Sequence, residues 1–264
     1  MTLRVAIEGV AFWASRLPGW DLAQAVIRGE QPAPEAPSAR PSPTLLAPTE
    51  RRRAPDTVAV ALEVAGRACE AAGRKPSDLP SVFASTHGDT AISDYMCATL
   101  AGTPTLISPI KFHNSVHNAA AGYWSIGTSS LAPYTAISAY QYTFGAGLLE
   151  AATQVVCENR AVLYVVFDIE SKGALATMAA SRGLFGAALV LAPVAHNQQH
   201  RKMILTTETV ASLAPTPARS GAASLVSDNA MAPCMPLFEV LAYSSPRTIR
   251  LCLSRTAALN VQVN

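Results

Sequence analysis

The chain has 264 residues, of which 50% are hydrophobic and only 14% are charged, and its formal net charge is +2. Its lysines and arginines are scattered, without a basic stripe that includes aromatic residues, and this excludes nucleic-acid binding. We expect residues 1–264 to form a single domain whose sparse charge cannot cover every face, so that part of its surface is buried in an oligomer.

The N-terminus lacks the basic start and small-residue cleavage site of a signal peptide and has the pattern of a first strand. A run of three arginines at residues 51–53 is expected to be a solvated, ion-pairing face. The elements predicted before residue 105 are a strand at 4–10, a helix at 21–28, a proline-rich surface loop at 31–50, a helix at 56–72, a strand at 79–85 and a helix at 91–100.

The stretch from Phe112 to Leu149 contains no Asp, Glu, Lys or Arg. Its Asn, Ser, Thr, Gln and Pro content nevertheless argues against a membrane span, because lipid cannot satisfy those polar groups. We therefore expect no transmembrane segment and assign this stretch to the protein core.

Within this stretch a strand is predicted to turn sharply into a helix near Tyr140 and Gln141. Residues 135–138 are small and β-prone, and the apolar residues from Phe144 to Val155 recur at helical spacing. Gly145 and Gly147 would let the helix lie close to neighbouring backbone, as a buried central helix requires.

The rest of the chain continues the alternation of strands and helices, which favours a layered α/β sandwich. The predicted elements are buried strands at 161–167 and 184–194, an amphipathic strand at 202–210, a short helix from Pro236 to Tyr243, and strands at 248–254 and 258–263. The five cysteines are dispersed and have no metal-ligand spacing, which indicates a reduced chain in the cytoplasm without a bound metal.

The residues around this turn resemble a known family. The segment Asn118-Ala-Ala-Ala-Gly-Tyr-Trp-Ser-Ile126, continuing through Pro133 to Gln141, is similar to the N-x-x-A-G-x-x-[ST]-I stretch of β-ketoacyl synthases. The likeness covers about the first two thirds of the chain and is most specific over residues 107–167. It implies a thiolase-like layered α/β sandwich, truncated relative to a full ketosynthase.

In this register the nucleophilic cysteine of the family falls on Gln141. A carboxamide has neither the ionisable proton nor the nucleophilicity of a thiol. The family's two later histidine motifs are also missing, since only His196 and His200 follow Gln141, in a polar stretch expected to be a surface loop. The resemblance therefore implies no catalytic residue and loss of the condensing reaction. The alternative is that Gln141 is a structural amide in the core.

Glutamine at this position is typical of chain length factors, the inactive partners of certain ketosynthases. The resemblance implies a heterodimer with a full-length ketosynthase subunit, contact with an acyl carrier protein through that subunit, and no cofactor. The segment from Ser108 to Asn118 is similar to short ketosynthase-like proteins of aryl-polyene pathways. Two alternatives are a malonyl-carrier decarboxylase that uses Gln141 and a stand-alone acyl-binding homodimer.

The residues expected at the pocket or the interface share the region of this likeness. His113 and His117 are spaced so that they could bind zinc on one helix face, but no third ligand is evident, and we favour a structural pair near an interface. Tyr140 and Tyr142 replace the family's small residues and would crowd an acyl tunnel. The expected pocket or interface residues are Tyr140, Tyr142, His113, His117, Asn118 and Phe144.

Overall fold

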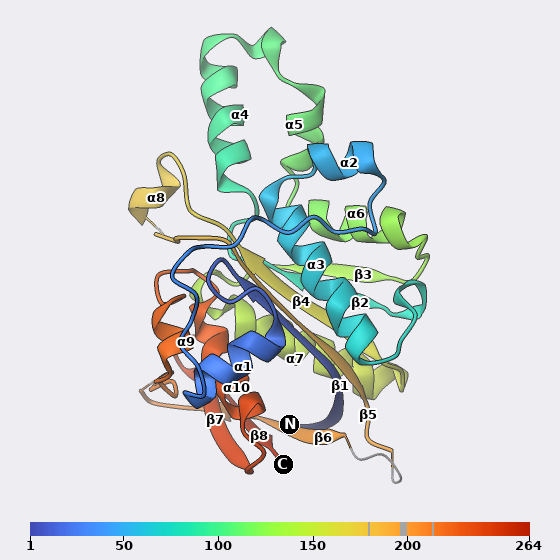
Figure 1. Cartoon of the computed structure of the whole chain (residues 1–264), viewed down its shortest axis with the longest axis vertical. Coiled ribbons are helices and arrows are strands. Elements are labelled where there is room, and N and C mark those ends of the chain that lie inside the picture. The colour runs from blue at the N-terminus through green and yellow to red at the C-terminus, as the bar shows by residue number, and fades with distance from the viewer. Residues whose placement is uncertain (179, 196–199, 213) are drawn as a thin grey trace.

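A long sheet forms the centre of the computed structural model, which describes residues 1–178, 180–195, 200–212 and 214–264 (Figure 1). Within these residues the sheet has eight strands in the order β3-β2-β4-β5-β1-β6-β8-β7. The strands are β1 (Thr2–Ala14), β2 (Ser81–Ala84), β3 (Tyr134–Ile137), β4 (Val162–Asp168), β5 (Phe185–Pro193), β6 (Arg201–Thr209), β7 (Arg247–Cys252) and β8 (Ala257–Val263).

The strands β3, β2 and β4 are parallel, whereas β5 is antiparallel to both β4 and β1. β1 pairs with β5 on one side and with β6 on the other, so the first strand of the chain connects the two halves of the sheet. β3 lies at the edge and pairs with β2 alone.

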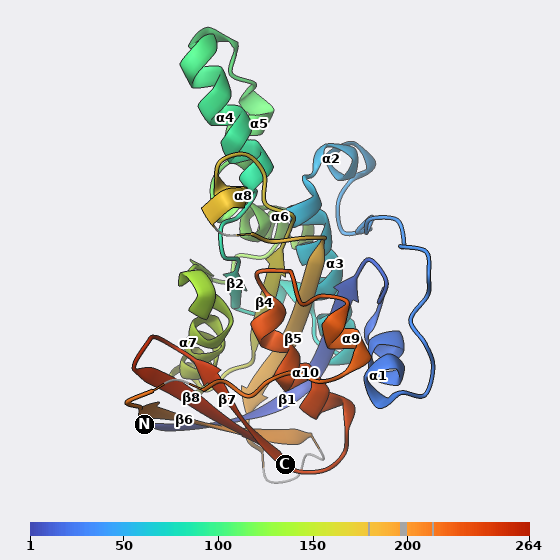
Figure 2. The same cartoon turned by 90° about the vertical axis from the view of Figure 1, so that its left-hand side faces the viewer.

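Helices cover both faces of the sheet and make the structure layered (Figure 2). α3 and α6 pack on one face, and α7 packs on the other together with α1, α9 and α10. The α-helices are α1 (Trp20–Arg28), α2 (Pro48–Arg53), α3 (Asp56–Ala71), α4 (Thr90–Gly102), α5 (Pro109–Asn114), α6 (Ala119–Thr128), α7 (Thr143–Glu158), α8 (Leu175–Met178), α9 (Gly221–Ser224) and α10 (Met235–Ala242). Single 3₁₀ turns lie at η1 (Pro76–Asp78), η2 (Pro104–Leu106), η3 (Tyr140–Tyr142) and η4 (Ala232–Cys234).

The structure confirms the predicted α/β class and corrects three boundaries. The first strand is longer than residues 4–10, and the strand predicted at 79–85 is shorter. The proline-rich loop predicted at 31–50 ends earlier, because α2 begins at Pro48. Proline is well suited to the first helical position, since its φ angle is already helical and its missing N–H would have no partner there. No helix of the described residues is long and apolar enough to cross a membrane.

α7 is the buried central helix that the sequence predicts. A Cβ atom built on Gly145 would lie 2.5 Å from the carbonyl oxygen of Cys252 in β7, and one on Gly147 would lie 2.7 Å from the Tyr164 ring in β4. The Tyr164 hydroxyl also donates a 2.6 Å hydrogen bond to the carbonyl oxygen of Phe144. Two glycines therefore allow this helix to pack closely between β4 and β7.

The Gly145→Ala variant should lower the free energy of unfolding by about 1–3 kcal/mol, because the added methyl group overlaps a backbone oxygen that cannot rotate away. The matched control is Gly122→Ala in α6, whose added Cβ would meet nothing within 4 Å and should stabilise the chain by about 0.5–1 kcal/mol. Urea unfolding of both variants tests this. Equal effects of the two substitutions would contradict the close packing of α7.

Candidate functional site

The sharp turn predicted near Tyr140 and Gln141 joins the edge strand to the central helix. β3 ends at Ile137, the 3₁₀ turn η3 spans Tyr140–Tyr142, and α7 begins at Thr143. Tyr140 has a φ angle of +51°, in the left-handed region that residues other than glycine seldom adopt. A backbone in this region is held there by its surroundings, and this is a common feature of functional turns.

Hydrogen bonds from short side chains hold the turn in place. The buried Thr143 hydroxyl donates to the carbonyl oxygen of Tyr140 at 2.6 Å and accepts from the Ala139 N–H at 3.0 Å. The Ser138 hydroxyl donates to the carbonyl oxygen of Thr86 at 2.7 Å, which ties the turn to the loop after β2. The position of Gln141 is thus set by the surrounding backbone.

Gln141 is exposed, so the alternative in which it is a buried core amide is wrong. Its Nε2 atom donates a 2.7 Å hydrogen bond to the hydroxyl of Tyr142. None of the residues of η3 is buried, whereas α7 enters the core with the buried Thr143 and Phe144. Gln141 lies one residue before Tyr142, the N-cap of α7, and a nucleophile close to a helix N-terminus benefits from the helix dipole.

Gln141, Tyr142 and Phe144 line a cavity of about 410 Å³. Most of the remaining wall is apolar, and its members are Gly145, Pro215, Thr216, Ala218, Ala232, Pro233, Pro236, Arg250, Leu251 and Cys252. The cavity is therefore mostly built from segments that are distant from Gln141 in the sequence.

The ionisable side chains in this wall are poorly suited to nucleophilic chemistry. Burial raises the pKa of the Cys252 thiol, which disfavours the reactive thiolate. The Arg250 guanidinium donates at 3.2 Å to both Asn260 and Glu208, so its charge is already compensated. No histidine is among the described residues that line the cavity.

The two tyrosines of the turn have different surroundings. Tyr142 lines the cavity, whereas Tyr140 is 52% exposed and is not among the lining residues. The Tyr140 ring instead lies beside His87, with 5.8 Å between the ring centroids.

His113, His117 and Asn118 lie apart from this cavity and have separate partners. α5 ends at Asn114, so His113 and His117 do not share a helix face and lack the arrangement that a zinc pair on one helix requires. His117 Nε2 donates to the carbonyl oxygen of Ser85 at 2.8 Å, and the His113 ring lies 5.8 Å from that of Tyr123. The Asn118 amide donates to the Tyr134 hydroxyl at 3.1 Å.

A buried polar cluster behind the turn was not predicted from the sequence. Asp168, at the end of β4, is only 3% exposed and accepts hydrogen bonds from the Thr86 N–H at 2.9 Å and the Ser85 hydroxyl at 3.1 Å. Burial raises the pKa of the Asp168 carboxyl, although these hydrogen bonds oppose the effect. A signal for this cluster was present in the sequence, because Ser85 follows β2 and Asp168 ends β4. These two strands are parallel, so their carboxyl ends meet at one edge of the sheet.

Of the two histidines that follow Gln141, the structure describes one. His200 is exposed, as predicted for a surface loop. His196 lies outside the described residues.

Comparison with known proteins identifies the fold and the family. The family model described as "Beta-ketoacyl synthase, N-terminal domain" matches residues 26–233. The structure is similar to a ketosynthase in complex with its chain length factor from Xenorhabdus doucetiae, with a TM-score of 0.71 and 18% identity over 98% of this chain and 99% of the other. No curated protein matches the chain.

Two further solved structures have the same fold over almost their whole length. The ishigamide ketosynthase/chain length factor matches with a TM-score of 0.70 and 14% identity over 99% of both chains. A type II polyketide synthase acyl carrier protein in complex with its ketosynthase matches with a TM-score of 0.76 and 11% identity over 100% of this chain and 99% of the other. At these identities the likeness shows a thiolase-like ketosynthase fold.

Asp168 should make stability depend on pH in a defined direction. Its raised pKa means that the folded chain binds this proton more tightly than the unfolded chain, so the stability contributed by Asp168 falls as pH rises from its ordinary pKa to its raised pKa. The Asp168→Asn variant lacks this ionisable carboxyl group, so its stability has no such dependence on pH. Urea unfolding between about pH 4 and pH 8 should therefore show the wild type losing stability relative to the variant as pH rises. If the difference in free energy of unfolding between the wild type and the variant does not change with pH, the raised pKa is contradicted.

Proposed function

The chain belongs to the β-ketoacyl synthase family through its N-terminal domain, and we propose that it is a non-catalytic subunit, of the chain-length-factor type, that pairs with an active ketosynthase. The observation that carries this proposal is Gln141 in the 3₁₀ turn that leads directly into the buried helix α7. In the proposed register the turn and its cavity correspond to the thiolate site of the family, and the residue there has no thiol.

The shape of the site supports a structural role in a product tunnel. The cavity beside Gln141 is largely apolar, and Tyr142 and Phe144 form part of its wall. A cavity of this kind can limit an apolar chain by its volume without reacting with it. We propose that the chain limits product length in this way.

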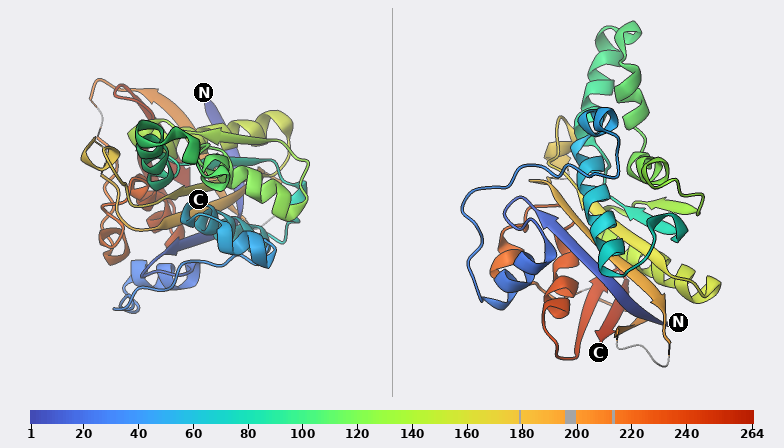
Figure 3. Two further views of the ribbon diagram at one scale, coloured as in Figure 1. Left: turned by 90° about the horizontal axis from the view of Figure 1, so that it is seen from above. Right: turned by 45° about the vertical axis from the view of Figure 1, so that its right-hand side comes forward.

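A set of exposed hydrophobic side chains supports the presence of a partner. The helices α4 and α5 extend away from the sheet, as Figures 1 and 3 show. Large hydrophobic side chains are exposed on these helices, on α6 and near β3, namely Leu100, Leu106, Ile110, Phe112, Val116, Ile126, Leu131 and Tyr134. We name this set the α4–β3 surface.

The α4–β3 surface is also poor in charge. From Phe112 to Leu149 the sequence has no Asp, Glu, Lys or Arg, and Lys111 packs over the Tyr95 ring at 4.0 Å. β3 adds a strand edge without a neighbour in the described sheet. Exposed apolar area, low charge and an open strand edge are together typical of a surface that another subunit covers.

The related structures are consistent with such a pairing. Two of the similar structures contain a ketosynthase and a chain length factor, and a third contains a ketosynthase with an acyl carrier protein. We propose that this chain acts in the cytoplasm, meets the carrier protein through its partner, and serves elongation of a polyketide-type or fatty-acid-type polyene. The likeness of residues 108–118 to aryl-polyene proteins supports the last point.

Co-expression with a ketosynthase from the same source tests the pairing. The Phe112→Asp variant should reduce the amount of co-purified partner by about tenfold or more, because an interface would have to bury an unpaired carboxylate. Phe112 is 62% exposed, so the substitution should leave the fold intact. The matched control is Val156→Asp on α7, 46% exposed and outside the α4–β3 surface, which should leave co-purification unchanged. A soluble wild-type monomer that captures no ketosynthase would overturn the pairing.

Restoring a thiol tests the non-catalytic role. The Gln141→Cys variant, paired with a ketosynthase whose own nucleophile is removed, should form no elongated product, because none of the described residues that line the cavity is a histidine. Mass spectrometry of carrier-bound products is the measurement. Elongated product from this variant would contradict the proposal. Acetyl-carrier formation by the wild type alone, lost in Gln141→Ala, would favour the decarboxylase instead.

A further inference from the structure

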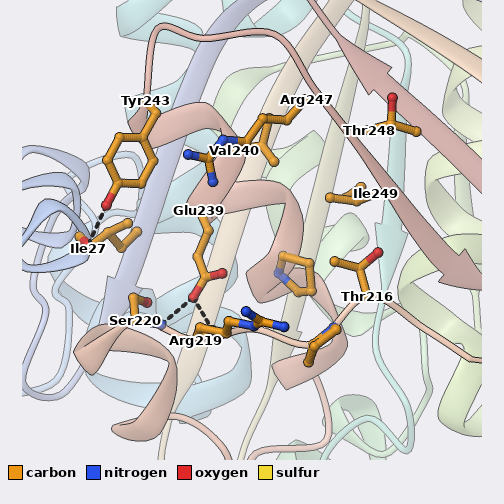
Figure 4. Close-up of a pocket in the computed structure, with 12 residues that line it drawn as sticks. Ile27, Thr216, Arg219, Ser220, Glu239, Val240, Tyr243, Arg247, Thr248 and Ile249 are labelled. Atoms are coloured by element: carbon orange, nitrogen blue, oxygen red, sulfur yellow. Dashed lines mark hydrogen bonds between the residues drawn. The ribbon is translucent and has the colours of Figure 1, made fainter.

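A second cavity, of about 420 Å³, lies between α10, β7 and the segment before α9 (Figure 4). Thr216 and Pro236 line both this cavity and the one beside Gln141. The two cavities are thus neighbours that share part of one wall. We refer to the second one as the Arg219–Arg247 cavity.

Part of the lining of the Arg219–Arg247 cavity is apolar. Ile27 of α1, Val240 of α10 and Ile249 of β7 contribute to its lining, and Figure 4 shows them around the same space. Tyr243 forms another part of the wall, and its hydroxyl donates to the carbonyl oxygen of Ile27 at 3.2 Å. This hydrogen bond links the wall residue to α1, so the apolar lining is built from three separate elements.

Two arginines border this apolar space. Both are exposed, and among the described residues neither guanidinium forms an ion pair with a carboxylate. Arg247 lies over the Tyr243 ring at 4.9 Å, an arrangement that positions the guanidinium and leaves its N–H donors available. By contrast Arg250, also on β7, is held by Glu208 and Asn260.

The carboxylate that lines the cavity has other partners. Glu239 Oε1 accepts the backbone N–H groups of Arg219 at 2.7 Å and Ser220 at 2.6 Å (Figure 4). Its charge therefore anchors the segment before α9 to α10. The charged residues that line the cavity are thus two arginines and one glutamate, whose carboxylate already accepts two backbone hydrogen bonds. The net charge of the lining is positive.

From this arrangement we propose that the Arg219–Arg247 cavity binds an amphipathic carboxylate. The carboxylate head takes hydrogen bonds from the two guanidinium groups, which match its planar geometry. The apolar body lies along Ile27, Val240 and Ile249. This binding site is independent of the proposed pairing with a ketosynthase, because it uses neither Gln141 nor the α4–β3 surface.

Isothermal titration calorimetry with three probes separates the contributions of head and body. The 264-residue chain, in the assembly in which it purifies, should bind octanoate more tightly than octan-1-ol, which lacks the charge, or inorganic phosphate, which lacks the body. The Arg219→Ala and Arg247→Ala variants should each weaken octanoate binding by about tenfold, the typical effect of losing a charged hydrogen bond. The control variant is Arg160→Ala, whose arginine is exposed and pairs with Glu158 at the end of α7.

Several outcomes would overturn the proposal. Equal binding of octanoate and octan-1-ol would remove the role of the arginines, and equal binding of octanoate and phosphate would remove the role of the apolar body. Failure of octanoate to bind, or an effect of Arg160→Ala as large as that of Arg247→Ala, would also contradict it.

Photolabelling distinguishes this cavity from the one beside Gln141. A diazirine analogue of octanoate should label residues 239–249, and the double variant of Arg219 and Arg247 should lose this label. Because only the neighbouring cavity includes residues 141–145, labels confined to those residues would show that the ligand occupies the Gln141 cavity and would overturn the assignment. The experiment does not depend on whether the chain pairs with a ketosynthase.

Discussion

The close packing of α7 is the constraint on which the rest of the structure depends. The helix lies between β4 and β7 because Gly145 and Gly147 leave room for the Cys252 carbonyl group and the Tyr164 ring. Since α7 is held in the core, the chain must reverse abruptly after β3, and Tyr140 adopts a left-handed backbone there. Gln141 is presented at the helix N-terminus as a result.

The site brings together a strand-to-helix turn and a largely apolar cavity at Gln141. A helix N-terminus favours an anion, yet Gln141 carries no ionisable group, and burial raises the pKa of the nearby Cys252 thiol. The cavity wall is apolar, and Arg250 is already compensated. Under the proposed function the site acts through its shape, and the exposed apolar side chains of the α4–β3 surface meet the partner subunit.

The sequence predicted the elements near the site better than it predicted their contacts. The strand before the turn, the glycines of α7 and the exposed position of His200 follow from local patterns, and the structure has them. The alternative of a zinc pair on one helix face fails because α5 ends at Asn114, before His117, whereas the favoured position of the two histidines near an interface stays a prediction. The proximity of His87 to Tyr140 had no local signal, because the pairing of β2 with β3 creates it.

The amino-acid sequence by itself determined the α/β class, the strand-to-helix turn and the presence of a carboxamide at residue 141, because these depend on residue types and short-range periodicity. Only the tertiary structure decided which side chains share a cavity. Arg250 reaches the Gln141 cavity, and Arg219 and Arg247 flank the neighbouring one, because β7 and the segment before α9 fold back beside α7 and α10. Contacts between residues so far apart in the chain arise from sheet pairing and layer packing, which leave no regular pattern in the sequence.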